Sequence, residues 1–225
     1  MNIITIKKGD LDKDNFYKND CVGNWDNYEN THVEIEENLG WVKFKKGVYI
    51  NGYLEVKAGS GIEAGWGIKA GWGIKAGEGI EAGEGIEAGS GIKAGWGIEA
   101  GSGIKAGSGI KAGEGIKAGW GIKAGEGIEA GEGIEAGSGI EAGLQITCNL
   151  SLNIAYRIFS GLALWKKELT EDEKTISCGK LENGKVEYGI LKEVGMPDVK
   201  KEKTNAKTIK IKMANGEVVK GEIIE

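Results

Sequence analysis

Few residues in this chain have the types and spacing that catalysis requires. The only histidine, His32, lies in a polar segment without an evident neighbour to orient it as a general base. We therefore expect an ordinary surface or turn histidine. The many Gly-x-Gly units alternate with isoleucine and charge, and they lack the Lys-Ser/Thr pair of a phosphate-binding loop. The sequence predicts a protein that is not an enzyme and binds no cofactor.

One acidic stretch has the outline of a metal site. Asp10, Asp12 and Asp14 alternate as the first ligands of a calcium loop do. The sixth position of such a loop needs glycine and is Asn15 here, and the last ligand position holds Cys21 instead of glutamate. We expect a solvated polar turn without a metal.

The remaining chain-wide properties indicate where the protein works. Three cysteines, Cys21, Cys148 and Cys178, are sparse and lack metal-binding spacing, which favours reduced thiols in a cytosolic protein; a contact between Cys148 and Cys178 stays open. The beginning of the chain has no apolar run typical of a signal peptide, and no segment is suited to span a membrane. A net charge of −5 argues against direct nucleic-acid binding.

These residues surround a repeat that dominates the sequence. The hexad Gly-Ile-(Glu/Lys)-Ala-Gly-(Trp/Glu/Ser) occurs in unbroken succession from Ile62 to Ile140. In an extended chain alternate side chains point to opposite faces, so Ile and Ala point inward and the charged residue between them points outward. Glycine accepts positive φ without steric cost, so the pair Gly65 and Gly67 around Trp66 predicts a tight corner. Strand and corner at a fixed length predict an all-β single-chain β-solenoid.

Two windings fit a six-residue side. Two sides give 12 residues per coil and place Trp72, Trp96 and Trp120 on one edge. Three sides give 18 residues per coil, and we favour this winding because Ile and Ala on three sides fill a prism. The charged positions then sort by face into three sets: Glu63, Glu81, Glu99, Lys117 and Glu135; Lys75, Lys93, Lys111 and Glu129; and Lys69, Glu87, Lys105, Lys123 and Glu141.

The flanking segments predict small β-rich caps. We divide the chain into an N-terminal cap (residues 1–55), the solenoid (56–144), closing strands (145–165) and a C-terminal β-hairpin region (166–225). The cap has strand patterns at 3–6, 33–36, 41–44 and 48–50. The alternate residues from Ile146 to Leu164 are mainly apolar, which predicts a half-buried strand or hairpin. Asn183-Gly184 predicts one hairpin turn, and a second hairpin is expected after residue 207.

The hexads resemble those of hexapeptide-repeat proteins, whose best-known members are left-handed parallel β-helix acyltransferases. The resemblance covers about ninety residues and rests on the period and the isoleucine spacing. In that family the small inward residue stands two before the large one, whereas here Ile62 precedes Ala64. The transferases use a histidine between coils, and His32 lies outside the repeats. The resemblance therefore implies a solenoid but not transferase activity.

The outward corner positions are the best candidates for function. Exposed tryptophans are enriched in binding hot spots, and glutamates add an acidic component that would mimic phosphates in a basic groove. The candidate residues are Trp66, Trp72, Trp96, Trp120, Glu78, Glu84, Glu126 and Glu132. The alternative is that the rings pack against neighbouring corners or caps and the glutamates serve solubility.

The sequence thus predicts a non-enzymatic protein that binds a protein partner, which would be a nucleic-acid-binding protein of the host. One form of this is a phage or mobile-element inhibitor of a host defence nuclease, an anti-CRISPR-like protein acting in the host cytosol. Two alternatives stay open: a structural protein that self-assembles into a fibre or another homo-oligomer, and an ice-binding protein, although the repeats lack threonine rows.

Overall fold

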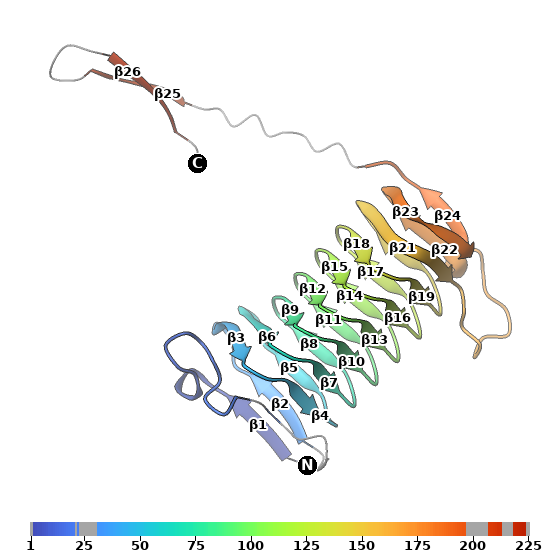
Figure 1. Ribbon diagram of the computed structural model, residues 1–225, viewed down its shortest axis with the longest axis horizontal. Coiled ribbons are helices and arrows are strands. Elements are labelled where there is room, and N and C mark those ends of the chain that lie inside the picture. The colour runs from blue at the N-terminus through green and yellow to red at the C-terminus, as the bar shows by residue number, and fades with distance from the viewer. Residues whose placement is uncertain (1, 21, 23–30, 197–206, 213–217, 224–225) are drawn as a thin grey trace.

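The computed structural model describes residues 2–20, 22, 31–196, 207–212 and 218–223. Apart from two short 3-10 helices, η1 (Lys8–Asp10) and η2 (Asp172–Lys174), its regular elements are β-strands. Figure 1 shows them stacked along one axis as a solenoid. Each repeat strand pairs in parallel with the strands 18 residues before and after it, as Ile86 does with Ile68 and Ile104. The three-sided winding is therefore confirmed, and the two-sided alternative is wrong.

The strands form three faces that wind in the order B, C, A. Face A consists of β1 (Asn2–Ile6), β2 (Thr31–Ile35), β5 (Leu54–Val56), β8 (Ile74–Ala76), β11 (Ile92–Ala94), β14 (Ile110–Ala112), β17 (Ile128–Ala130), β20 (Ile146–Cys148), β22 (Thr175–Cys178) and β24 (Ile190–Glu193). Face B consists of β3 (Gly40–Phe44), β6 (Ser60–Ala64), β9 (Ile80–Ala82), β12 (Ile98–Ala100), β15 (Ile116–Ala118), β18 (Ile134–Ala136) and the first part of β21 (Ser151–Ser160). Face C consists of β4 (Val48–Ile50), β7 (Ile68–Ala70), β10 (Ile86–Ala88), β13 (Ile104–Ala106), β16 (Ile122–Ala124), β19 (Ile140–Ala142) and the second part of β21.

The core lies inside this prism and has the composition that the hexad predicts. Isoleucines such as Ile104 stack on their equivalents in the next coil and are at most 1% exposed from Ile62 to Ile140. The paired alanines are buried beside them. Because burying an isoleucine side chain is worth about 1.5–3 kcal/mol, this continuous column is the main stabilising feature of the fold.

The repeat glycines serve a different purpose from the one expected. None of the glycines from Gly61 to Gly143 has φ in the left-handed region, so the expectation of positive φ at the corners is wrong. A Cβ on the glycine after each alanine would lie about 2 Å from a backbone oxygen of the preceding coil, as at Gly113, where the distance to the Gly95 oxygen would be 1.9 Å. Glycine is required at this position because two coils approach each other closely.

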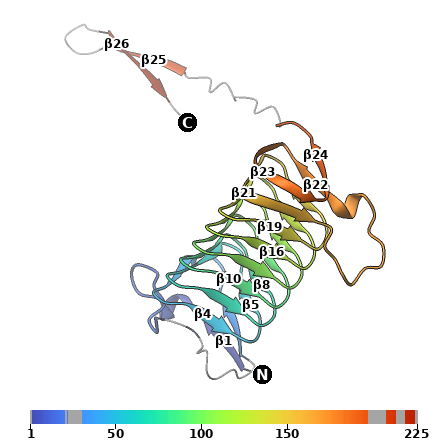
Figure 2. The ribbon, with the colours of Figure 1, turned by 45° about the vertical axis from the view of Figure 1, so that its right-hand side comes forward.

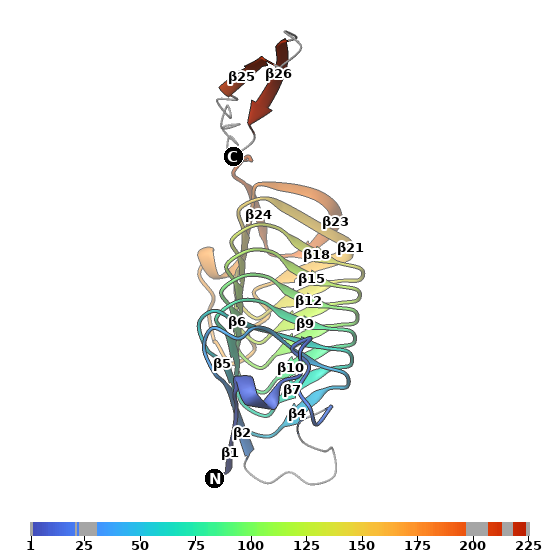
Figure 3. The same cartoon turned by 90° about the vertical axis from the view of Figure 1, so that its left-hand side faces the viewer.

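The N-terminal segment continues the three faces beyond the repeats, as Figure 3 shows from the side. The predicted strands are confirmed as β1, β2, β3 and β4. β1 extends face A by pairing in parallel with β2. Isolated parallel bridges from Phe16 to Lys43 and from Val22 to Val48 cover the first strands of faces B and C.

The alternating pattern after the repeats is only partly a buried strand. Ile146, Leu152 and Ile158 occupy the isoleucine positions of the hexad, as predicted. Tyr156, by contrast, is 68% exposed, because the even positions include the outward corner residue of each hexad. Leu164 is 99% exposed and lies in the loop between β21 and β22, which projects from the coil in Figures 1 and 2, so its predicted burial is wrong.

The first predicted hairpin is also wrong. Asn183 and Gly184 lie within β23 (Lys180–Tyr188), which pairs in parallel with β21 and continues the winding instead of reversing it. The register shift between Asn153 and Arg157 on β21 falls opposite this pair, and Gly184 has φ +108°. The glycine thus lets β23 follow the solenoid corner. The second hairpin is confirmed: β25 (Lys207–Lys212) pairs antiparallel with β26 (Val218–Ile223). Its predicted turn, the linker before it and the segment 24–30 lie outside the described residues.

Candidate functional site

The candidate tryptophans point outward but do not form one patch. Their exposed fractions are 49% for Trp66, 56% for Trp72, 46% for Trp96 and 68% for Trp120. We call the corner between faces B and C edge 1, that between C and A edge 2, and that between A and B edge 3. Backbone hydrogen bonds between successive corners place Trp66 and Trp120 on edge 1, Trp72 on edge 2 and Trp96 on edge 3.

The corner glutamates are distributed unequally. Glu84 lies on edge 1 and Glu126 on edge 2, whereas edge 3 carries three glutamates. Along edge 3, each backbone N–H donates to the corner oxygen one coil earlier, at 3.2 Å from Trp96 to Glu78, 3.3 Å from Glu114 to Trp96 and 3.2 Å from Glu132 to Glu114. The structure therefore brings together Glu78, Trp96 and Glu132 of the predicted set, and it adds Glu114.

Face B borders edge 3 and is also acidic. Its outward row contains Glu63, Glu81, Glu99 and Glu135. Desolvation at the sheet surface, and then the charges of Glu63 and Glu99, raise the pKa of Glu81. We call these four glutamates, together with Glu78, Glu114 and Glu132 of edge 3, the acidic surface.

A shallow groove of about 550 Å³ runs along face B beside the acidic surface. Its floor is the column of glycines that precede the isoleucines, because these positions have no outward side chain. Trp41 closes one end: a Cβ on Gly61 would lie 3.1 Å from its indole ring and one on Gly79 2.6 Å. Ser151, which occupies the glycine position after Gly133, lies at the other end. The groove is therefore a bare backbone channel with carboxylate walls.

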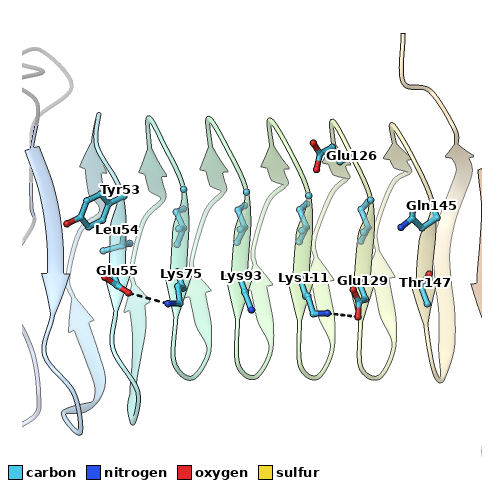
Figure 4. Close-up of a pocket in the computed structure, with 18 residues that line it drawn as sticks. Tyr53, Leu54, Glu55, Lys75, Lys93, Lys111, Glu126, Glu129, Gln145 and Thr147 are labelled. Atoms are coloured by element: carbon cyan, nitrogen blue, oxygen red, sulfur yellow. Dashed lines mark hydrogen bonds and ion pairs between the residues drawn. The ribbon is translucent and has the colours of Figure 1, made fainter. Parts of the chain in front are cut away.

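Face A has a groove of about 700 Å³ with the opposite charge, drawn in Figure 4. Tyr53 and Gln145 stand at the glycine position at its two ends. Lys75, Lys93 and Lys111 form its wall, and Figure 4 shows them as successive residues of one row. The row is flanked by glutamates that pair with the outer two lysines.

The other candidate residues have structural roles. His32 is not a surface or turn residue, as expected, but is 2% exposed within β2. Its Nδ1 accepts a hydrogen bond of 2.9 Å from the Tyr53 backbone N–H, and Trp72 packs edge-on against its ring at 5.1 Å between centroids. Trp72 thus partly follows the alternative of packing against a cap, because its neighbour in the cap has an outward aromatic ring.

The acidic stretch near the N-terminus is a turn. Oδ1 of Asp12 accepts backbone N–H groups from Asp14 and Phe16, both at 2.9 Å. Among the described residues, no group of three or more His, Cys, Asp and Glu side chains is placed to hold a metal ion. Likewise, no helix in the described part of the chain is long and apolar enough to cross a membrane.

The described cysteines, Cys148 and Cys178, are unbonded and buried on neighbouring strands of face A. Burial first, and then the neighbouring Cys178, raises the pKa of Cys148 to about 12. A thiol with so high a pKa is a poor nucleophile at neutral pH. Cys21 lies outside the described residues.

Comparison with known proteins supplies no relative: no protein-family model, no curated protein sequence and no solved structure matches this chain. The surfaces themselves must therefore carry any functional argument. Sequence reasoning missed Trp41, Tyr53 and Glu114 as parts of these surfaces. The signal for the two aromatic residues was available, since each stands where the hexad frame, extended backwards, would require an outward glycine.

Proposed function

We propose that this protein is a non-enzymatic binding protein whose acidic surface occupies the nucleic-acid-binding groove of a basic protein. The observation that carries the proposal is the gathering of seven carboxylates on face B and edge 3, with Trp96 between Glu78 and Glu114. An exposed tryptophan ringed by charge is typical of a binding hot spot.

The charge density of the acidic surface supports mimicry of a nucleic acid. Lys43 and Lys117 lie in the same row and offset two of the seven carboxylates, so five net negative charges remain. From Glu63 to Glu135 the row spans four coil spacings of about 4.8 Å, or about 19 Å. This is about one charge per 4 Å, close to the one per 3.4 Å of a single nucleic-acid strand.

The rigidity of the solenoid would help such binding, because every acidic residue is fixed by a neighbouring coil and little conformational entropy is lost on association. A specific form of the proposal is an inhibitor, encoded by a phage or mobile element, of a host defence nuclease. Such an enzyme presents a basic groove, and blocking it requires no catalytic residue in the inhibitor.

The test is competition with nucleic acid. The immobilised protein is exposed to a nuclease-treated bacterial lysate, and bound proteins are eluted with short single-stranded DNA. We expect a stoichiometric basic partner that DNA releases and that the Glu114→Gln, Glu132→Gln double variant of edge 3 retains at least tenfold less. The matched control is Glu84→Gln with Glu126→Gln, which removes two corner charges from the other edges. A partner that DNA does not displace, or that both double variants retain equally, would overturn the proposal.

A further inference from the structure

Faces A and B carry opposite charges over five successive coils. The outward row of face A reads Glu55, Lys75, Lys93, Lys111, Glu129. The outward row of face B on the same five coils reads Lys43, Glu63, Glu81, Glu99, Lys117. Every position of one row has the opposite charge in the other. We call them the basic row and the acidic row.

Within one chain, the ends of each row are satisfied and the centres are not. On face A, Lys75 pairs with Glu55 at 3.3 Å and Lys111 with Glu129 at 2.7 Å. Lys93 forms no ion pair with any described residue, and Figure 4 shows it between the two bonded pairs.

The acidic row has the same arrangement with the signs exchanged. Lys43 pairs with Glu63 at 3.0 Å and Lys117 with Glu99 at 3.6 Å. Glu81 stands between two glutamates and has no ion pair among the described residues.

Folding of a single chain does not account for this arrangement. Like charges directly opposite each other on neighbouring strands destabilise a sheet, so a mixed row would be more favourable. Face C shows such a row: Glu87 pairs with Lys69 at 3.2 Å and with Lys105 at 3.4 Å, and Lys123 pairs with Glu141 at 2.6 Å. The solenoid therefore tolerates mixed rows, and faces A and B differ from face C by the segregation of their charges.

We propose that face A of one molecule docks on face B of a second copy of this chain. Both rows place one residue on each coil, so their spacings are identical at about 4.8 Å and the charges meet in register. The contact would pair Lys93 of one copy with Glu81 of the other, which are the two central residues without a partner of their own. The flanking lysines and glutamates meet in the same way.

The edges decide the relative direction of the two molecules. The order of charges in each row is symmetric, so the rows match with parallel or antiparallel axes. With parallel axes, facing strands run in opposite directions, and edge 3 of one copy lies against edge 3 of the other, bringing Glu78, Glu114 and Glu132 near their equivalents. With antiparallel axes, edge 3 lies instead against edge 1 or edge 2, where Trp and Ser residues predominate. The antiparallel arrangement avoids this repulsion.

The contact leaves a free face B on one copy and a free face A on the other, so it is heterologous and association is not limited to a dimer. Five coils span only about 24 Å, which makes the contact small compared with stable interfaces of about 800 Å² per partner. Association is therefore weak and depends on electrostatics. It should weaken steeply with salt, since screening shortens from about 10 Å at 0.1 M to about 3 Å at 1 M.

The test uses the whole chain in sedimentation equilibrium at low and high salt. We expect the weight-average mass to rise with concentration at low salt and to equal that of one chain at about 1 M salt. Lys93→Glu and Glu81→Lys each break the central contact and should weaken association about tenfold. Neither variant should fail to fold, because each replaces a run of three like charges by alternating ones.

Mixing the two variants provides the decisive measurement. The basic row of the Lys93→Glu variant complements the acidic row of the Glu81→Lys variant, so a mixture should associate as strongly as the unaltered protein. The control is Lys105→Glu on face C, which changes charge equally and should leave association intact. A chain that stays monomeric at low salt, a mixture that does not recover, or a control that loses association as much would overturn the proposal. Lys93→Glu lies outside the acidic surface, so it separates this contact from binding of a basic protein, which only Glu81→Lys would weaken.

Discussion

The two glycines that flank Glu114 offer a direct test of why the hexad contains two glycines. At Gly113, a Cβ would lie 1.9 Å from the Gly95 backbone oxygen, far inside van der Waals contact. At Gly115, the nearest atom is the Gly133 oxygen at 3.4 Å, which is an ordinary contact. Neither residue has positive φ, so Gly113→Ala and Gly115→Ala differ in packing but not in backbone conformation.

The magnitude of the difference follows from the hydrogen bonds at this corner. Relieving the clash at Gly113 requires two coils to separate by more than 1 Å. This disrupts the bonds from Gly113 N to Ala94 O (3.2 Å) and from Glu114 N to Trp96 O (3.3 Å). At about 1 kcal/mol for each bond, with about 1–3 kcal/mol of overpacking, Gly113→Ala should lower the free energy of unfolding by about 3 kcal/mol or more. Gly115→Ala should be neutral or stabilise by up to about 1 kcal/mol, because alanine restricts the unfolded chain.

Urea denaturation of the two variants, monitored by circular dichroism, measures both free energies. The variants have the same composition and flank the same residue, so each is the control for the other. Equal destabilisation would show that close approach of the coils is not what requires glycine after alanine. The explanation would also be refuted if Gly115→Ala were the more damaging of the two.

Three further predictions concern individual outward or buried groups. Because the folded-state pKa of Glu81 is raised by desolvation and like charge, its favourable contribution exists at low pH and is lost as pH rises through that pKa; Glu81→Gln should gain stability over the unaltered protein between about pH 4 and about pH 7, and urea midpoints showing no such gain would contradict this. In a Cys21→Ser variant, burial and the high pKa of Cys148 should leave the native protein unreactive toward a thiol reagent at about pH 8, with both remaining thiols reacting in urea; rapid native labelling would be inconsistent with the structure. Trp120→Ala should change stability by less than about 0.5 kcal/mol, whereas Trp72→Ala should cost about 1 kcal/mol through its contact with His32, and calorimetry should rank them in that order.

The fold could be predicted because the hexad repeats the same local instruction many times. Ile62 and Ala64 stand two apart, so their inward direction follows from strand geometry alone. The 18-residue coil followed from how these residues fill a prism. The role of the glycines could not be predicted in the same way, because the contact between Gly113 and Gly95 exists only once the coils are stacked. Local conformational preference therefore suggested the correct residue for the wrong reason.

The ends of the solenoid were harder to predict, since they depend on pairing with a strand already in place. Asn183-Gly184 has the sequence of a hairpin turn, but β21 offers β23 an unpaired parallel edge, and this tertiary pairing overrides the local preference. His32 was misjudged for a related reason. Its polar neighbours suggested exposure, whereas burial comes from Tyr53 and Trp72, which lie one and two coils further along face A.

The candidate site was predicted as a set of residue types, but its grouping needed the winding. Trp66, Trp72 and Trp96 look equivalent in the sequence, yet they lie on three different edges because successive hexads turn through successive corners. Only the coil length reveals which corners stack. Edge 3 became the acidic edge by this rule, and Glu114 joined it although it had not been among the selected residues.

The segregation of charge is information that the fold itself does not need. Adding or removing one hexad would leave every Ile and Ala inward and the solenoid intact, yet it would move each later charged residue to the next face. Lys111 would then leave the row of Lys93, and Lys117 would leave the row of Glu99. A change of this kind costs nothing in core packing and would destroy the complementarity of faces A and B. The charge rows therefore constrain the number of hexads more tightly than folding does, which is the behaviour expected of a surface used for recognition.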